Sequence, residues 1–141
     1  MYLCDTNLIS ELRKAGTGRA DPNVVAWAEQ VAPERLHLSA ITLLELEMGI
    51  LRIERRDMAQ GRILRHWLEQ QVMPAFAGRI LPINEEVARR CAHLHVPDPR
   101  SDRDALLAAT ALVHGLTVVT RNVADFVPTG VLLLNPWEDA L

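Results

Sequence analysis

Short apolar runs alternate with longer helical patterns along this chain, and each run predicts a buried strand. The runs stand at residues 2–4, 36–39, 79–81, 116–119 and 131–134. Between them, apolar residues recur at spacings of three and four, which is typical of helices with one buried face. Continuous apolar strands separated by helices are typical of a parallel sheet covered on both sides. The pattern therefore predicts a three-layer α/β domain with about five strands.

Polar and helix-breaking residues predict where the helices begin and end. We expect helices over residues 8–12, 24–31, 42–56, 57–73, 84–94 and 101–115. Thr42 and Glu45 have the spacing of a capping box, which predicts a helix start at Thr42. Pro74 predicts that the preceding helix stops before it. No repeat, low-complexity tract or linker interrupts the pattern, so we expect one domain over residues 1–141.

Four acidic residues occupy equivalent places relative to these elements. Asp5 ends the first strand, Glu45 falls in the first turn after the second, and Asp125 follows the fourth. Asp104 falls in the first turn of the helix that leads into the fourth strand. Since the residues after parallel strands share one edge of the sheet, we expect the four carboxylates to lie together there. Each acid taken singly also suits a helix cap.

Carboxylates that converge repel one another, and a divalent metal ion compensates that repulsion better than helix N-termini do. Every candidate ligand is an oxygen donor, and no Cys or His pair has the spacing of a zinc site. The acids therefore predict a site for Mg²⁺, with Mn²⁺ as the alternative. Metal-bound water and open coordination positions are what hydrolysis of a phosphodiester bond requires.

Composition limits how the chain could bind nucleic acid. Aromatic residues make up 4% of the sequence, which excludes an extended platform on which successive bases stack. The formal net charge of -3 excludes a histone-like basic surface. Of 15 basic residues only Lys14 is a lysine, and arginines suit discrete contacts to phosphate. A biased genomic base composition would produce the same preference for arginine.

The sequence also favours a cytoplasmic protein. Cys4 and Cys91 lie in separate apolar stretches and make no disulfide framework. Asp5 interrupts the first apolar run, where a signal peptide would need its hydrophobic region. No stretch approaches the roughly 18 apolar residues of a membrane span, so we expect no membrane partner.

Taken in order, the motifs resemble those of the PIN-domain ribonucleases, and among them the VapC-type toxins of bacterial toxin–antitoxin pairs. The similarity extends over essentially the whole chain. Its pieces are Leu3-Cys4-Asp5-Thr6-Asn7, residues 38–46 with Gly49, residues 104–111, residues 115–122 with Asp125, and Asn135-Pro136-Trp137.

The resemblance implies a Mg²⁺-dependent endoribonuclease that acts as a toxin and hydrolyses RNA phosphodiester bonds. It assigns the catalytic ion to Asp5, Glu45 and Asp104, with Asp125 as a fourth acidic member. It also places Asn7, Ser39, Thr120 and Asn122 around these acids as supporting polar residues. In such proteins the fold is a single three-layer α/β/α PIN domain.

The resemblance further implies two protein partners. Similar toxins form homodimers and are silenced by a small DNA-binding antitoxin whose tail lies across the active cleft. The helices over 42–56 and 57–73 combine apolar faces with clustered arginines, and we expect an antitoxin segment in a groove between them. One departure from the family is the segment before Asp104, residues 95–103, which has two prolines and two extra acids. RNA binding is the property that this stiffer, less basic loop would change.

Two other functions use the same features. A non-catalytic PIN-like scaffold that binds RNA or protein would need no acids, yet all four are present. A phosphoacceptor domain of receiver type also gathers acids at strand ends. That reading requires paired acids after the first strand and a lysine late in the chain, whereas Lys14 is the sole lysine.

Overall fold

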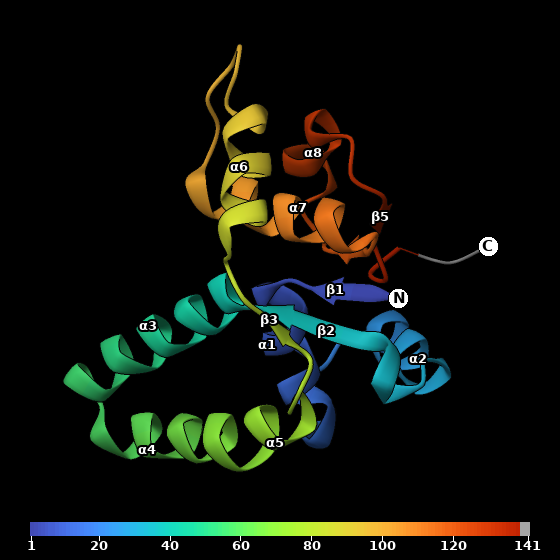
Figure 1. Ribbon diagram of the computed structural model, residues 1–141. Coiled ribbons are helices and arrows are strands. Elements are labelled where there is room, and N and C mark those ends of the chain that lie inside the picture. The colour runs from blue at the N-terminus through green and yellow to red at the C-terminus, as the bar shows by residue number, and fades with distance from the viewer. Residues whose placement is uncertain (139–141) are drawn as a thin grey trace.

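The computed structural model describes residues 1–138 and contains a parallel sheet with the strand order β3-β2-β1-β4-β5 (Figure 1). The strands are β1 (Tyr2–Cys4), β2 (Leu36–Ser39), β3 (Ile80–Leu81), β4 (Thr117–Val119) and β5 (Leu133–Leu134). In the centre, Tyr2 of β1 pairs with Leu36 of β2 and with Thr117 of β4. The predicted five-stranded parallel sheet is confirmed, while the single domain expected over residues 1–141 includes three residues outside the described part.

Alternate residues of the strands pack against two different helical layers. The helices are α1 (Thr6–Arg13), α2 (Pro22–Gln30), α3 (Ala40–Arg56), α4 (Met58–Trp67), α5 (Met73–Ala75), α6 (Glu85–Leu94), α7 (Asp102–His114) and α8 (Val123–Phe126). Cys4 and Val119 face a core shared with α1 to α4, whereas Leu3 and Val118 face one shared with α7 and α8. Helix α6 packs on α7, which completes the three-layer α/β/α arrangement seen in Figure 1.

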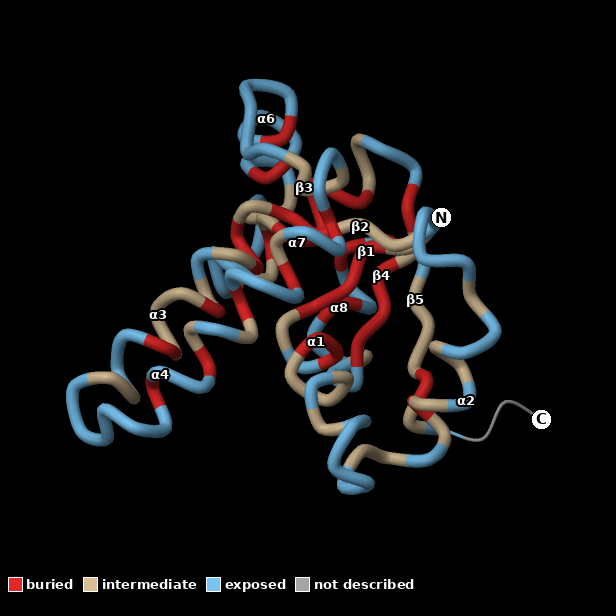
Figure 2. Tube along the Cα trace, turned by 90° about the horizontal axis from the view of Figure 1, so that it is seen from below, coloured by how far each residue is buried: buried red, intermediate tan, exposed pale blue. Residues whose placement is uncertain are grey.

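Helices α3 and α4 form a hairpin that projects from the sheet, with much of its outer surface exposed in Figure 2. Its two helices approach closely at Gly61, where an added Cβ would lie 2.7 Å from the Glu54 Cα. Arg65 of α4 connects the two helices through ion pairs with Glu54 and Glu47 of α3. Within residues 1–138, none of the helices is long and apolar enough to cross a membrane.

The start of α3 corrects the predicted capping box. The N-cap is Ser39, whose Oγ accepts a hydrogen bond of 3.1 Å from the Ile41 N–H. The helix therefore begins at Ala40, directly after β2, and Glu45 falls in its second turn instead of its first. Thr42 is fully buried, and its Oγ1 has no hydrogen-bond partner among the described residues. A polar residue at the end of the strand caps the helix before Thr42 is reached.

Helical structure also continues past Pro74, so the predicted stop before this proline was wrong. After α4 the chain makes a π-helical turn over Leu68–Val72, in which the Met73 N–H bonds to the Leu68 carbonyl. Pro74 then falls in the first turn of α5, directly after this π-helical turn. The Phe76 N–H bonds to the Val72 carbonyl at 3.1 Å and spans the proline.

Candidate active site

Asp5 combines a structural role with a candidate catalytic one. It directly follows β1 and is buried, with 6% of its surface exposed, and its Oδ1 accepts a hydrogen bond of 2.8 Å from the Leu8 N–H. Burial raises the pKa of the Asp5 carboxyl above its ordinary value, while hydrogen bonds from Thr120 and the Leu8 N–H lower it. The charges of Glu45 and Asp104 raise the same pKa further. Asp5 thus caps α1 and also faces two other acids.

Glu45 reaches the site from α3 and is held by residues from two other helices. Thr6 Oγ1, at the start of α1, donates a hydrogen bond of 2.9 Å to Glu45 Oε1. Arg103, near the start of α7, places its Nη1 3.7 Å from Glu45 Oε2. The ends of α1 and α7 therefore meet the second turn of α3 at this carboxylate.

Asp104 lies in the first turn of α7, next to Arg103. The Ser101 Oγ, which caps the helix, accepts a hydrogen bond of 3.4 Å from the Asp104 N–H. Burial raises the pKa of the Asp104 carboxyl, and the charges of Asp125 and Glu45 add to the effect. Asp125 itself is exposed on α8. The four acids predicted from the sequence thus interact electrostatically: Asp5 with Glu45 and Asp104, and Asp104 also with Asp125.

The donor chemistry of this cluster suits Mg²⁺, although the carboxylates do not close around a single point. Within residues 1–138, no three His, Cys, Asp or Glu side chains lie close enough together to hold one ion. Mg²⁺ keeps several water ligands and commonly uses only one or two carboxylates together with substrate phosphates. All the available donors are oxygens, and their mutual repulsion is what a divalent cation would relieve. The residues therefore fit a hydrated Mg²⁺ better than a fully caged metal.

The four predicted supporting residues separate into two pairs. Ser39 caps the helix that carries Glu45, and buried Thr120 lies near Asp5 and lowers the pKa of its carboxyl. The Thr120 Oγ1 also accepts a hydrogen bond of 3.0 Å from the Asn122 N–H. Asn7 and Asn122 are exposed and line a neighbouring cavity of about 470 Å³.

Sequence reasoning missed Thr6 and Arg103, which both contact Glu45. Thr6 belongs to the recognised run that includes Asp5, and Arg103 directly precedes Asp104. Their positions next to two acids were the available signal. The sequence did not indicate that both residues would contact Glu45, because Glu45 lies 39 residues from Thr6.

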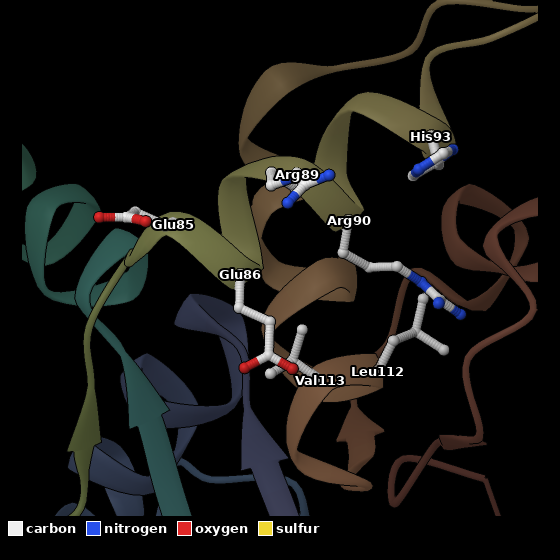
Figure 3. Close-up of a pocket in the computed structure, with 7 residues that line it drawn as sticks. All are labelled: Glu85, Glu86, Arg89, Arg90, His93, Leu112 and Val113. Carbon is white, nitrogen blue, oxygen red and sulfur yellow. The ribbon is translucent and has the colours of Figure 1, made fainter.

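A cavity of about 600 Å³ lies elsewhere, on the outer side of α6 and α7 (Figure 3). Glu86, Arg90 and His93 line it from α6, and Leu112 and Val113 line it from α7. None of the four clustered acids lines this cavity, so its size does not make it the candidate active site.

The sequence profile of the PIN domain matches residues 2–126 of this chain. The chain belongs to the PIN-domain family. The matched segment contains all four clustered acids. The cluster therefore lies within the family's domain and not in an added segment.

Similar proteins match this PIN domain from end to end. VapC ribonuclease Y4jK of Sinorhizobium fredii is 40% identical over 148 residues, covering 99% of this chain and 100% of the relative. Toxin FitB of Neisseria gonorrhoeae is 40% identical over 147 residues, with the same two coverages. The crystal structure of FitAcB from Neisseria gonorrhoeae superposes with a TM-score of 0.88 at 37% identity, covering 98% of this chain and 99% of that one. Toxin–antitoxin complexes are also among the solved structures that share the fold.

Proposed function

We propose that this PIN domain is a divalent-metal-dependent endoribonuclease and the toxin of a toxin–antitoxin pair. The observation that carries the proposal is that Thr6 and Arg103, the sequence neighbours of Asp5 and Asp104, both contact the Glu45 carboxylate. Its relatives named VapC ribonuclease and toxin FitB support the same activity and biological role.

In this proposal Asp5, Glu45 and Asp104 hold a hydrated ion, partly through its water ligands, with Asp125 as the fourth acid. Mg²⁺, or Mn²⁺ in its place, would supply a water nucleophile and stabilise negative charge on the phosphoryl group. Asp5 is fixed for this task because its carboxylate is buried and accepts a hydrogen bond from the Leu8 N–H. Thr6 orients Glu45 through the hydrogen bond to Oε1.

The cleavage test uses purified protein and a mixture of single-stranded RNAs with added Mg²⁺. We expect cleavage that EDTA abolishes and Mn²⁺ restores, and loss of cleavage in the Asp104→Asn variant. Arg62→Gln serves as a matched surface control, because Arg62 is exposed on α4, away from the acids. Metal-independent cleavage, or full activity of Asp104→Asn, would contradict the proposal. RNA binding without cleavage would favour the non-catalytic scaffold.

The α3–α4 hairpin supports the antitoxin part of the proposal. A groove of about 400 Å³ lies between α3 and the helical segment that follows α4. Its apolar lining consists of Leu43 and Leu44 from α3 and of Leu68 and Met73 from the facing segment. Leu44 is 47% exposed there, and Leu51, Met58 and Ile63 add exposed apolar surface to the hairpin. An amphipathic antitoxin helix would bury these side chains, and its charged tail would extend toward the acids.

The antitoxin test adds the product of a neighbouring small reading frame to the cleavage reaction. We expect inhibition at stoichiometric amounts, and weaker inhibition of Leu44→Glu than of the wild-type protein. Leu132→Glu is the matched control, because Leu132 is 70% exposed but lies directly before β5, outside the hairpin. Undiminished cleavage with excess partner would show that this partner is not an inhibitor. Equal inhibition of both variants would show that the inhibitor does not bind in this groove. The homodimer expected for such toxins is tested by light scattering.

A further inference from the structure

A polar cavity of about 470 Å³ lies beside the clustered acids and is separate from them. Asn7, Glu11 and Lys14 line it from α1 and the turn that follows. Arg121 and Asn122, after β4, and Trp137, after β5, form the opposite wall. The cavity thus lies between the first helix and the ends of the last two strands.

The topology places this cavity next to Asp5 along the edge of the sheet. Asn7 follows Asp5 by two residues, and Asn122 follows by three residues Val119, whose carbonyl accepts a hydrogen bond of 3.2 Å from the Asp5 N–H. Strand β1 lies between β2, which leads to Glu45, and β4, which leads to Arg121. A strand of RNA that crosses the acids from the β2 side toward the β4 side would therefore enter the cavity.

The charges in the cavity suit a phosphate group. Lys14 and Arg121 supply two cations, and Glu11 supplies one carboxylate. That carboxylate is already engaged: its Oε2 accepts a hydrogen bond of 2.9 Å from the Asp21 N–H, and its Oε1 lies 3.5 Å from Lys14 Nζ. Glu11 therefore anchors the wall, and the two cations leave a net positive surface in a chain whose formal net charge is -3.

Trp137 gives the same cavity a fixed aromatic surface. Its backbone N–H donates a hydrogen bond of 3.0 Å to Asn135 Oδ1, and its carbonyl accepts one of 3.0 Å from Asn23 Nδ2. The ring is partly buried against the core, and the Arg121 guanidinium lies over it at 5.8 Å from its centre. An indole with a neighbouring guanidinium is a good stacking surface for one base, which does not require an aromatic-rich chain.

We propose that this cavity is a subsite for one RNA nucleotide adjacent to the scissile phosphate. Arg121 and Lys14 contact its phosphate, its base stacks on Trp137, and the side-chain amides of Asn7 and Asn122 contact the base edge or ribose. The subsite rests on the proposed ribonuclease function, and it assigns substrate binding to residues outside the acidic cluster.

The binding test uses labelled single-stranded RNA and the Asp104→Asn protein, in which the proposed cleavage does not consume the probe. Fluorescence anisotropy is recorded at several salt concentrations. We expect Arg121→Gln to weaken binding about tenfold at low salt and to reduce the slope of log Kd against log salt concentration by about 0.7, the value for one phosphate contact on a single strand. Arg62→Gln on the same background should leave both quantities unchanged.

A second arm tests stacking. Trp137→Leu should weaken RNA binding roughly tenfold, whereas Trp137→Phe should restore most of the affinity because it keeps an aromatic face. Thermal melting checks that each variant is folded. Variants at Arg121 and Trp137 that bind RNA like the Arg62→Gln control would overturn the subsite and leave the cleavage result standing. If Asp104→Asn binds no RNA and the wild-type protein cleaves none, the ribonuclease proposal fails and the subsite fails with it.

Discussion

Thr6 Oγ1 donates a 2.9 Å hydrogen bond to Glu45 Oε1 and thereby joins the start of α1 to the second turn of α3. The contact fixes one oxygen of Glu45 while the other faces Arg103. It also connects Glu45 to the residue that directly follows Asp5. An uncharged hydroxyl thus links Glu45 to the segment that carries Asp5, although the two acids are far apart in the sequence.

Replacing Thr6 with valine removes this hydrogen bond with little change in side-chain shape. We expect the affinity for Mn²⁺, measured by isothermal titration calorimetry, to fall about tenfold, because residues that orient metal ligands typically contribute 10- to 100-fold. Thr6→Ser keeps the hydroxyl and should bind Mn²⁺ like the wild-type protein. Equal Mn²⁺ affinity in the valine variant would show that Thr6 does not position Glu45.

Two substitutions at Asp5 separate its capping role from its charge. Asp5→Asn keeps a good N-cap, whereas Asp5→Ala removes the acceptor of the Leu8 N–H. We expect both variants to lose RNA cleavage. Only Asp5→Ala should lose free energy of unfolding, by about 1 kcal/mol in urea denaturation. If Asp5→Asn is destabilised as much as Asp5→Ala, loss of the cap is not the cause.

The raised pKa values of Asp5 and Asp104 predict how stability depends on pH when no metal ion is present. The folded protein holds these protons more tightly than the unfolded chain, whose Asp carboxyls titrate near the ordinary value of 3.8. Protonation of the two carboxyls therefore adds to the free energy of unfolding, and this contribution is fully present below pH 3.8. It is lost as the pH rises through the raised pKa values of the folded protein. In urea unfolding with EDTA, the free energy of unfolding should fall less with rising pH in Asp104→Asn than in the wild-type protein. Identical pH profiles would contradict the interaction between Asp5 and Asp104.

The sequence was sufficient to predict the parallel sheet, and it predicts that the acids meet at one edge of that sheet. Apolar runs predict buried parallel strands, and residues that follow such strands converge regardless of the details of the loops. Local choices between equivalent residues were harder to predict: Ser39 and Thr42 are both good N-caps, and only the end of β2 decides between them. Contacts of Glu45 with Thr6 and Arg103 depend on packing between three helices, for which no local pattern exists.

Gly61 illustrates the same limit, since helix propensity and packing make opposite predictions there. Alanine would favour the helix by roughly 1 kcal/mol over glycine. Its Cβ, however, would lie 2.5 Å from the Glu54 Cγ and 2.7 Å from the Glu54 Cα, and the second contact is with backbone that does not move freely. Overpacking typically costs about 1–3 kcal/mol, so Gly61→Ala should lower the free energy of unfolding. Gly49→Ala, with open space around its Cβ, is the control and should raise it.

Arg103 leads to the opposite expectation from Thr6, although both contact Glu45. Its guanidinium stays charged at every accessible pH, and its Nη1 lies 3.7 Å from an oxygen that the proposed metal ion would need. A divalent cation therefore has to displace the guanidinium, whose side chain is 45% exposed and free to move toward solvent. Exposed pairs of this kind contribute about 0.2–1 kcal/mol, so removing one should tighten metal binding only modestly.

We expect Arg103→Ala to lower the Kd for Mn²⁺ about 1.4- to fivefold in calorimetry without RNA, the factor that corresponds to that energy at room temperature. Arg62→Ala removes an exposed arginine far from the acids and should leave the Kd unchanged, which controls for the change in net charge. Thr6→Val and Arg103→Ala should thus move the Mn²⁺ affinity in opposite directions, although each removes one contact to the same carboxylate. Weaker binding in Arg103→Ala would mean that the guanidinium supports the arrangement of the acids instead of competing with the ion.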